Sequence, residues 1–353
     1  MGATRRERTR PVDPLVDGLY RRLLDRHASR LFHSPPWLHV LRDAYGFRPQ
    51  ALLLLGPDGE PEGGVVACRI ADAMGARVVS LPFSDYCDPL VESCEDWETL
   101  FDALRSGGER VIVRCVHSTV TAADARLAVL KTARWHGLSL LPDLSALWRG
   151  LEPPKRRAIR RARRQGVELA ALEGDAFLDA FYRLHLGVRK QKYRLLPQPR
   201  RFFDAIRRRF EEANAWYPLA ARCGGRIVAA VILLRWGGTL YYKFSASDPA
   251  ALDLRPNDFL MWRAIEFAAE LGCAQLDLGL SDDDQSGLVR FKRQFGAEEK
   301  EIRFLCHDPG GAGADAAVEF RAALGRITQF LTDRAVPDEV TSAAGDRLYR
   351  YFA

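Results

Sequence analysis

Apolar and polar positions follow the same plan in two separate stretches of the chain. Between residues 51 and 89, short apolar runs separated by Gly-containing turns predict three successive antiparallel strands. Residues 219 to 249 repeat this plan with Gly-Gly turns. One constant offset relates the pairs Val65 and Val228, and Asp85 and Asp248. The chain therefore contains two copies of one strand meander. Such an internal repeat has to be identified before a fold is assigned.

Helical patterns flank both meanders. Apolar residues recur at helical spacing in residues 95–106, 174–190, 198–213 and 257–271. Duplicated units of strands and helices predict an α+β (mixed α/β) chain with two tandem domains, each a mostly antiparallel twisted sheet flanked by helices. We expect a helical lead-in at 1–29, domains at 30–143 and 144–308, and a helical tail at 309–353.

Length and composition agree with two soluble domains. The chain has 353 residues, 47% of them hydrophobic, which is enough for two cores. Its longest apolar stretch, Ile227–Leu234, is too short to span a bilayer, and its basic start has no apolar run behind it. Seven cysteines without a C-x-x-C pair predict neither a disulfide framework nor a zinc site. These features predict a cytoplasmic protein without a metal.

Basic residues outnumber acidic ones, and two clusters at 155–164 and 189–201 contain many of them. Arginine's planar fork suits phosphate and carboxylate, although an arginine- and alanine-rich chain is equally typical of a GC-rich bacterial genome. The clusters therefore leave two interpretations open. They form either solvated helix faces or a surface that binds anions.

Five phrases in order along the chain carry a family resemblance. They are FHSPPWLHVL (32–41), SLPFSDYCDPLV (80–91), RRAIRRARRQGVEL (156–169), LDLGLS (276–281) and SGLVRFKRQFGAEE (286–299). Together they resemble the FemAB-like branch of the GNAT acyltransferase superfamily, including CelD-type proteins, over roughly residues 30 to 306. The resemblance implies two tandem GNAT-like domains, in agreement with the repeat. The long helical hairpin of the peptidoglycan-bridge enzymes has no counterpart here.

Acyl transfer needs a positioned amine, donors for the developing oxyanion and an acceptor for the amine proton. The alternation of the strand puts Asp277 on the opposite face from Leu276 and Leu278. There the carboxylate is either a general base or the cap of the next turn. Lys292 interrupts an apolar pattern. It is either surface decoration or, as the resemblance implies, a cleft residue that binds an anion. Asp277 and Lys292 are therefore the catalytic candidates.

The donor site is expected near the second meander. The phrase DLRPNDF lacks the glycines of a phosphate cradle, yet Arg255 and Asn257 stand at a predicted helix N-terminus, where phosphate binds. Lys243 and Ser245 lie on the strand that would flank the acyl-transfer gap. We assign these four residues to the cofactor. The expected donor is acetyl-CoA or another acyl-CoA, with aminoacyl-tRNA as the alternative.

The acceptor site is expected at Asp85 and Tyr86, which follow a strand, and at the basic clusters. Structural reasons explain the same residues equally well: turn formation explains Asp85 and Tyr86, and the dipole of a helix C-terminus explains basic residues at a helix end. The basic candidates are Lys155, Arg156, Arg160, Arg189 and Lys192.

The function predicted from these residues is transfer of an N-acyl, N-acetyl or aminoacyl group to an amine. The acceptor would be an anionic cell-envelope or exopolysaccharide precursor, either a small molecule or a lipid-linked sugar. Peripheral contact with an anionic membrane is a further expectation, and nucleic acid is not expected as a partner except tRNA as donor. The alternative is a non-catalytic anion- or nucleic-acid-binding protein, or a scaffold of polysaccharide assembly.

Overall fold

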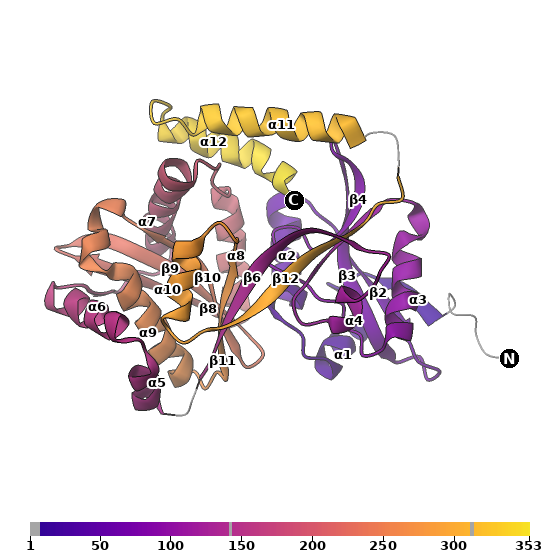
Figure 1. Ribbon diagram of the computed structural model, residues 1–353, viewed down its shortest axis with the longest axis horizontal. Coiled ribbons are helices and arrows are strands. Elements are labelled where there is room, and N and C mark those ends of the chain that lie inside the picture. Colours follow the sequence, from indigo (N-terminus) through magenta and orange to yellow (C-terminus); the bar gives the residue numbers. More distant parts are fainter. Residues whose placement is uncertain (1–7, 141–142, 311–313) are drawn as a thin grey trace. The chain divides into compact units, whose positions relative to one another are not determined.

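The computed structural model describes residues 8–140, 143–310 and 314–353 (Figure 1). Residues 1–7 of the expected lead-in, 141–142 near the end of the expected first domain and 311–313 of the expected tail lie outside the described residues. The chain divides into two compact units. Unit 1 comprises the residues up to 133, 300–324 and 351–353, and unit 2 comprises 134–299 and 325–350. The expected domain boundaries stay a prediction, because compactness does not test where a sequence repeat ends.

Unit 1 contains a six-stranded sheet in the order β1-β2-β3-β4-β5-β12. Neighbouring strands are antiparallel except β4 and β5, which run parallel and are joined through helix α3. The strands are β1 (Thr9–Val12), β2 (Pro49–Leu55), β3 (Pro61–Asp72), β4 (Gly75–Ser80), β5 (Arg110–Cys115) and β12 (Glu298–His307). The helices are α1 (Gly18–Arg26), α2 (Pro35–Tyr45), α3 (Cys94–Leu104) and α4 (Thr119–Ala122), with 3-10 turns at Leu31–His33 and Arg105–Gly107.

Helix α3 illustrates how the sequence builds unit 1. The Ser93 side chain accepts a hydrogen bond from the backbone N–H of Asp96, and acidic residues in the first turn complement the helix dipole. One face of α3 buries Trp97, Leu100 and Phe101 against the sheet. This cap and this apolar face fix the start and the orientation of the helix.

Unit 2 contains a second six-stranded sheet in the order β6-β11-β10-β9-β8-β7. Here β10 and β11 are the parallel pair, joined through helix α9, and the other neighbours are antiparallel. The strands are β6 (Ala128–Ser139), β7 (Glu168–Ala170), β8 (Trp216–Cys223), β9 (Arg226–Trp236), β10 (Thr239–Ser247) and β11 (Gln275–Ser281). The helices are α5 (Leu144–Gly150), α6 (Pro153–Arg164), α7 (Gly174–Gly187), α8 (Arg200–Glu212), α9 (Pro256–Glu270) and α10 (Ser286–Arg293), with a π-helix at Val188–Tyr193 and a 3-10 helix at Pro249–Leu254.

The two sheets share one connection pattern. In unit 1 an antiparallel meander, β2 to β4, is followed by α3 and the parallel strand β5. In unit 2 the meander β8 to β10 is followed by α9 and the parallel strand β11. The prediction of a duplicated, mostly antiparallel fold is therefore confirmed. The last strand of each sheet, β12 or β6, comes from a distant part of the sequence, which the repeat did not reveal.

The C-terminal helices α11 (Ala314–Leu331) and α12 (Asp338–Leu348) are followed by a 3-10 turn at Tyr349–Phe352. Basic residues of the second cluster hold the part of this tail that belongs to unit 2. The Lys190 ammonium donates to Asp338 Oδ1 at 2.7 Å and the Arg194 guanidinium to the Thr332 carbonyl at 2.6 Å. Several basic side chains of the second cluster are therefore hydrogen bonded to this tail. No helix in the described part of the chain is long and apolar enough to cross a membrane.

Candidate active site

The parallel strands of unit 2 form a fork. Over their whole described length, β10 and β11 pair at three positions only: Thr239 with Gln275, Leu240 with Leu276 and Tyr241 with Asp277. Beyond these positions β10 continues along β9 and β11 continues along β6. The two strands therefore separate toward their carboxyl ends, the edge at which sheets with parallel strands bind ligands.

Bulges on both strands mark the point of separation. The register shifts between Tyr242 and Phe244 on β10, and between Asp277 and Gly279 on β11. Gly279 has a φ of 67°, a backbone conformation that favours glycine. A bulge bends a strand and redirects its side chains, and bulges are frequent beside active sites.

Asp277 organises the base of the fork. Its side chain is 3% exposed. One oxygen accepts a hydrogen bond from Trp135 Nε1 at 2.8 Å, and the other accepts one from the Gly279 N–H at 2.7 Å. The carboxylate thus fixes the bulge of β11 and the indole of β6. Its predicted role as a general base stays a prediction, and in this structure both oxygens are already hydrogen bonded.

Lys292 reaches the end of β11 from α10. Its ammonium donates to the carbonyls of Gly279 (3.1 Å) and Leu280 (3.0 Å) and to the Ser281 hydroxyl (2.8 Å), and the residue is 5% exposed. The interpretation as surface decoration is therefore wrong. A buried cation now lies beside the unpaired end of β11, where it can stabilise negative charge.

Two ionisable groups of β6 and β12 complete the surroundings of Lys292. His136 is fully buried, with Nε2 3.1 Å from Glu299 Oε1. Burial, together with the charge of Lys292, lowers the pKa of His136 to about 4. Hydrogen bonds from the Arg293 guanidinium lower the pKa of Glu299. His136 is therefore neutral at pH 7 and Glu299 is ionised.

On the β10 side the fork is lined by polar residues of mixed exposure. Burial raises the pKa of the Tyr242 phenol, whose oxygen is bonded to the Ser245 side chain. Lys243 is half-buried with its ammonium 5.1 Å from the Phe244 ring centroid, and Ser245 is exposed. The Asn257 amide donates to the Ser247 hydroxyl at 3.1 Å. Three of the residues assigned to the cofactor thus lie along or next to β10.

The N-terminus of α9 follows directly. Arg255 is exposed and adopts a left-handed conformation with φ 60°, and Pro256 begins the helix. Asp258 in the first turn is 4% exposed and receives a hydrogen bond from the Lys155 ammonium at 2.8 Å. Lys155 lies over the Phe291 ring at 4.1 Å. A buried ion pair therefore neutralises the carboxylate at this helix end.

The remaining basic candidates do not gather at the fork. Arg156 is half-buried and donates to the Arg149 carbonyl at 2.7 Å, and Arg160 is exposed above the Trp148 ring. Arg189 donates to the Leu196 carbonyl at 2.9 Å, and Lys192 is exposed beside Tyr193. Their substrate-binding role stays a prediction.

In unit 1 the corresponding opening is filled by the chain itself. The Cys87 N–H donates to the Arg114 carbonyl at 2.9 Å, and the Arg114 guanidinium donates to the Ser84 carbonyl at 2.8 Å. Tyr86 is 1% exposed and Asp85 is half-buried. The segment after β4 thus closes the space beside β5, and the expected acceptor residues lie in this segment. Their role is untested.

The Asp88 carboxylate holds this segment against the loop after β5. Its Oδ1 accepts three successive backbone N–H groups, those of Val116 (2.9 Å), His117 (2.8 Å) and Ser118 (2.7 Å). Successive N–H groups that converge in this way form a nest that binds anions. Here the anion is the protein's own carboxylate.

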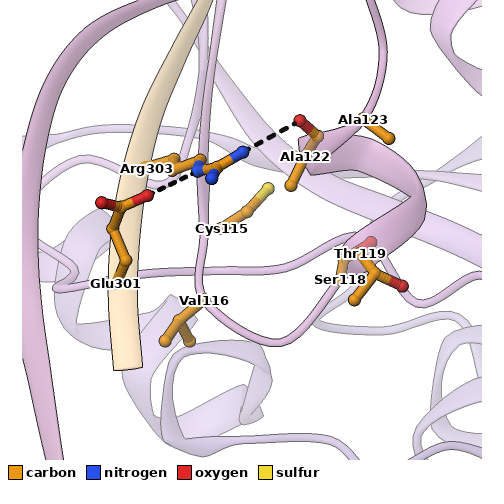
Figure 2. Close-up of a pocket in the computed structure, with 8 residues that line it drawn as sticks. All are labelled: Cys115, Val116, Ser118, Thr119, Ala122, Ala123, Glu301 and Arg303. Carbon is orange, nitrogen blue, oxygen red and sulfur yellow. Dashed lines mark hydrogen bonds and ion pairs between the residues drawn. The ribbon is translucent and has the colours of Figure 1, made fainter. Parts of the chain in front are cut away.

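A pocket of about 320 Å³ lies next to this nest in unit 1 (Figure 2). Figure 2 shows Glu301 and Arg303 of β12 on one side and the short helix α4 with Ala122 on the other. The Arg303 guanidinium is bonded to Glu301 at 2.6 Å and to the Ala122 carbonyl at 3.4 Å. Its charge is therefore satisfied within the pocket wall. The other lining residues are Cys115, Val116, Ser118, Thr119 and Ala123.

Several residues of the fork were not predicted from the sequence. Asp258, Trp135 and His136 are examples, and their contacts join segments more than 100 residues apart. One signal was present: Lys155 shares a helical face with Ile159 and Ala162, so its burial follows from the spacing. Among the described residues no group of three or more His, Cys, Asp or Glu side chains could hold a metal ion.

A meander, a helix and a diverging parallel strand, present twice, define a protein with two GNAT-like units. Residues 155–293 match the model of the acetyltransferase (GNAT) domain and carry that domain. The match lies within unit 2 and includes the fork. The GNAT part of the predicted resemblance is thereby confirmed for residues 155–293.

Solved structures with the same fold include three informative cases. FemX has a TM-score of 0.62 at 12% identity and covers 86% of this chain and 96% of its own. The C-terminal domain of an Agrobacterium fabrum protein assigned as a lysylphosphatidylglycerol synthetase has a TM-score of 0.55 at 15% identity, covering 86% and 95%. A tandem GNAT protein from the clavulanic acid biosynthesis pathway has a TM-score of 0.53 at 13% identity, covering 86% and 99%. No curated protein matches the chain.

Proposed function

We propose that this protein is an acyltransferase whose reaction takes place at the β10–β11 fork of unit 2. The supporting observation is the fork itself: two parallel strands pair at three positions and then separate. Backbone N–H and C=O groups at such an edge can pair with an extended ligand as a strand would. An acyl donor held this way presents its carbonyl to fixed donors, which lowers the barrier to attack by an amine.

Two buried ionisable side chains beside the fork support the proposal. Lys292 places a buried positive charge beside the unpaired end of β11. Asp277, bonded to Trp135 and Gly279, keeps the bulge in place. In our proposal Lys292 stabilises developing negative charge, and Asp277 is the carboxylate that holds the site in shape or accepts a proton.

The proposed donor is acetyl-CoA or another acyl-CoA. Its phosphates would meet the N-terminus of α9, where the exposed Arg255 stands and where the charge of Asp258 is neutralised by Lys155. An uncompensated carboxylate there would repel phosphate, so the ion pair is a condition for binding. When bound, the donor supplies the activated acyl group.

Aminoacyl-tRNA is the alternative donor. A lysylphosphatidylglycerol synthetase, by its name, joins a lysyl group to an anionic lipid, and its C-terminal domain shares this fold. We propose an amine of an anionic envelope or exopolysaccharide precursor as acceptor. A scaffold without activity is the remaining candidate.

Release of free thiol from acetyl-CoA in the presence of amine acceptors tests the proposal. Glucosamine 1-phosphate and an amino-sugar nucleotide are suitable probes. We expect Lys292→Met to lower the rate at least about tenfold, because its ammonium holds the end of β11 through three hydrogen bonds and places a positive charge beside the fork. Arg290→Met, at an exposed position of the same helix α10, is the matched control and should leave the rate unchanged.

Two outcomes would change the assignment. Transfer from aminoacyl-tRNA without thiol release from acetyl-CoA would keep the site and replace the donor. If neither donor reacted and neither acetyl-CoA nor CoA raised the melting temperature, the scaffold would be the better account.

A further inference from the structure

Helix α6 has a stripe of arginines on its outer side. The stripe, named here the arginine face, consists of Arg157, Arg160, Arg161 and Arg164, and all four are exposed. Their spacing of three, one and three residues puts them on one side of a helix. At about 100° per residue the arginine face lies about 180° around the helix from the buried positions. Those buried positions are Lys155, Ile159 and Ala162.

The inner side of α6 is packed within unit 2, next to α9 (Figure 1). Ile159 and Ala162 are completely buried there. The helix therefore has no apolar side left to insert elsewhere, and the arginine face is the surface that it offers to a partner.

The positive charge of this face is not neutralised within the part of the chain that the structure describes. Arg160 lies over the Trp148 ring, and Arg161 donates to the Gln165 side chain at 3.3 Å. Arg157 and Arg164 have neither a hydrogen-bond nor an ion-pair partner there, and α6 contains no acidic residue. Like charges one turn apart repel and destabilise a helix. A polyanion approaching from outside would relieve that repulsion.

The shape of the face indicates the class of partner. A helix surface is convex, so a small anion would be touched from one side only. The four arginines extend over about 10 Å along the axis, and a plane of negative charge can contact all of them together. Helix α6 contains no aromatic side chain, and the neighbouring Trp148 is half-buried with Arg160 over its ring. Single-stranded nucleic acid, by contrast, is bound by stacking on exposed aromatic rings. These features favour a membrane surface over single-stranded nucleic acid.

We propose that the arginine face docks unit 2 on the surface of an anionic lipid bilayer through its phosphate headgroups. Clusters of four or more basic residues bind anionic lipid in this way. The attachment is electrostatic and reversible by salt, because the apolar side of α6 is buried in the protein and no insertion accompanies it. Docking would hold the enzyme beside lipid-linked acceptors. The proposal goes beyond the proposed function and does not depend on catalysis.

Co-sedimentation of the full-length protein with vesicles tests this proposal. Vesicles of phosphatidylcholine alone are compared with vesicles that contain about 30 mol% phosphatidylglycerol, at low and at high salt. The test variant is R157Q/R160Q/R161Q/R164Q. The matched control is R21Q/R48Q/R183Q/R326Q, which removes the same charge from four exposed arginines on separate segments. Melting temperatures of both variants verify folding.

We expect the wild type to bind only the anionic vesicles, and to be released by salt. Each arginine near such a surface contributes about fivefold, so the test variant should bind on the order of 100-fold or more weakly. The control variant should lose much less of its affinity for anionic vesicles. Equal losses in both variants would show that total charge rather than α6 binds the lipid, and would overturn the proposal. So would a wild type that ignores vesicles but binds duplex RNA or tRNA through these arginines.

Discussion

The Lys155–Asp258 ion pair provides the sharpest test of how the site is built. The two side chains are 11% and 6% exposed, and the charged atoms are 2.8 Å apart. At an effective dielectric constant of about 20, Coulomb's law gives on the order of 6 kcal/mol for that separation. Removing both charges from water offsets most of this attraction. The net contribution of the pair is therefore small, but removal of one partner leaves an uncompensated buried charge.

We expect Lys155→Met to lower the free energy of unfolding by about 3 kcal/mol. The positive end of the α9 dipole stabilises the remaining Asp258 carboxylate and keeps the loss at the low end of the range. Asp258→Asn leaves the Lys155 ammonium over the faces of Phe291 and Phe295. These cation–π contacts still stabilise the ammonium by about 1–2 kcal/mol. Each single variant should thus be destabilised, and the double variant by less than the sum of the two.

Urea unfolding of the four proteins measures this coupling as a double-mutant cycle. Arg157→Met, exposed on the same helix, is the control and should change stability by less than about 0.5 kcal/mol. A coupling free energy below about 0.5 kcal/mol would refute the reasoning. So would a Lys155→Met protein of unchanged stability that has lost affinity for an anionic ligand, because Lys155 would then be a substrate contact.

Two further perturbations follow from buried polar groups. Trp135→Phe removes the N–H group that donates a hydrogen bond to Asp277 Oδ2. In urea unfolding we expect a loss of about 1–3 kcal/mol in stability, and a lower rate of acyl transfer because the β11 bulge loosens. Unchanged stability and rate would show that this hydrogen bond does not hold the site. Burial lowers the pKa of His185 to about 3. The unfolded chain, with a pKa near 6.5, takes up the proton first as the pH falls, so stability is present above pH 6.5 and lost below it, by about 3 kcal/mol at pH 4.5. His185→Phe keeps the ring packing and should flatten the decline between pH 6.5 and 4.5 in thermal unfolding scans, and an equally steep decline would contradict the assignment.

Much of the fold could be predicted because periodicity reports local structure. The helices expected at 174–190, 198–213 and 257–271 are α7, α8 and α9, which begin within two residues of the expected positions. The repeated meander followed from the apolar runs and the Gly-containing turns between them. The strands β6 and β12 could not be placed, because their partners β11 and β5 are distant in sequence and one sequence contains no information on pairing at that range.

The site was harder to predict than the fold. Lys292 was recognised from its motif, yet its three hydrogen bonds to the end of β11 depend on how α10 packs. Lys155 was grouped with the exposed arginines because it begins the same charged run. The helical face that it shares with Ile159 was the better guide. Its partner Asp258 is 103 residues away, so no local pattern could identify the ion pair.

The two units solve the same structural problem in opposite ways. A parallel strand that diverges from its neighbour leaves backbone groups to be satisfied. Unit 1 satisfies them with the segment after β4, held by Arg114 and by the Asp88 carboxylate in its nest. Unit 2 keeps its fork with two bulges, the left-handed Gly279 and the buried charges of Asp277 and Lys292. Buried charges and bulges usually lower the stability of a fold, and such departures from local rules are most often found at functional sites. The same duplicated plan therefore directs the search for catalysis to unit 2, because a closed version of the opening in unit 1 shows that the fold does not require an open one.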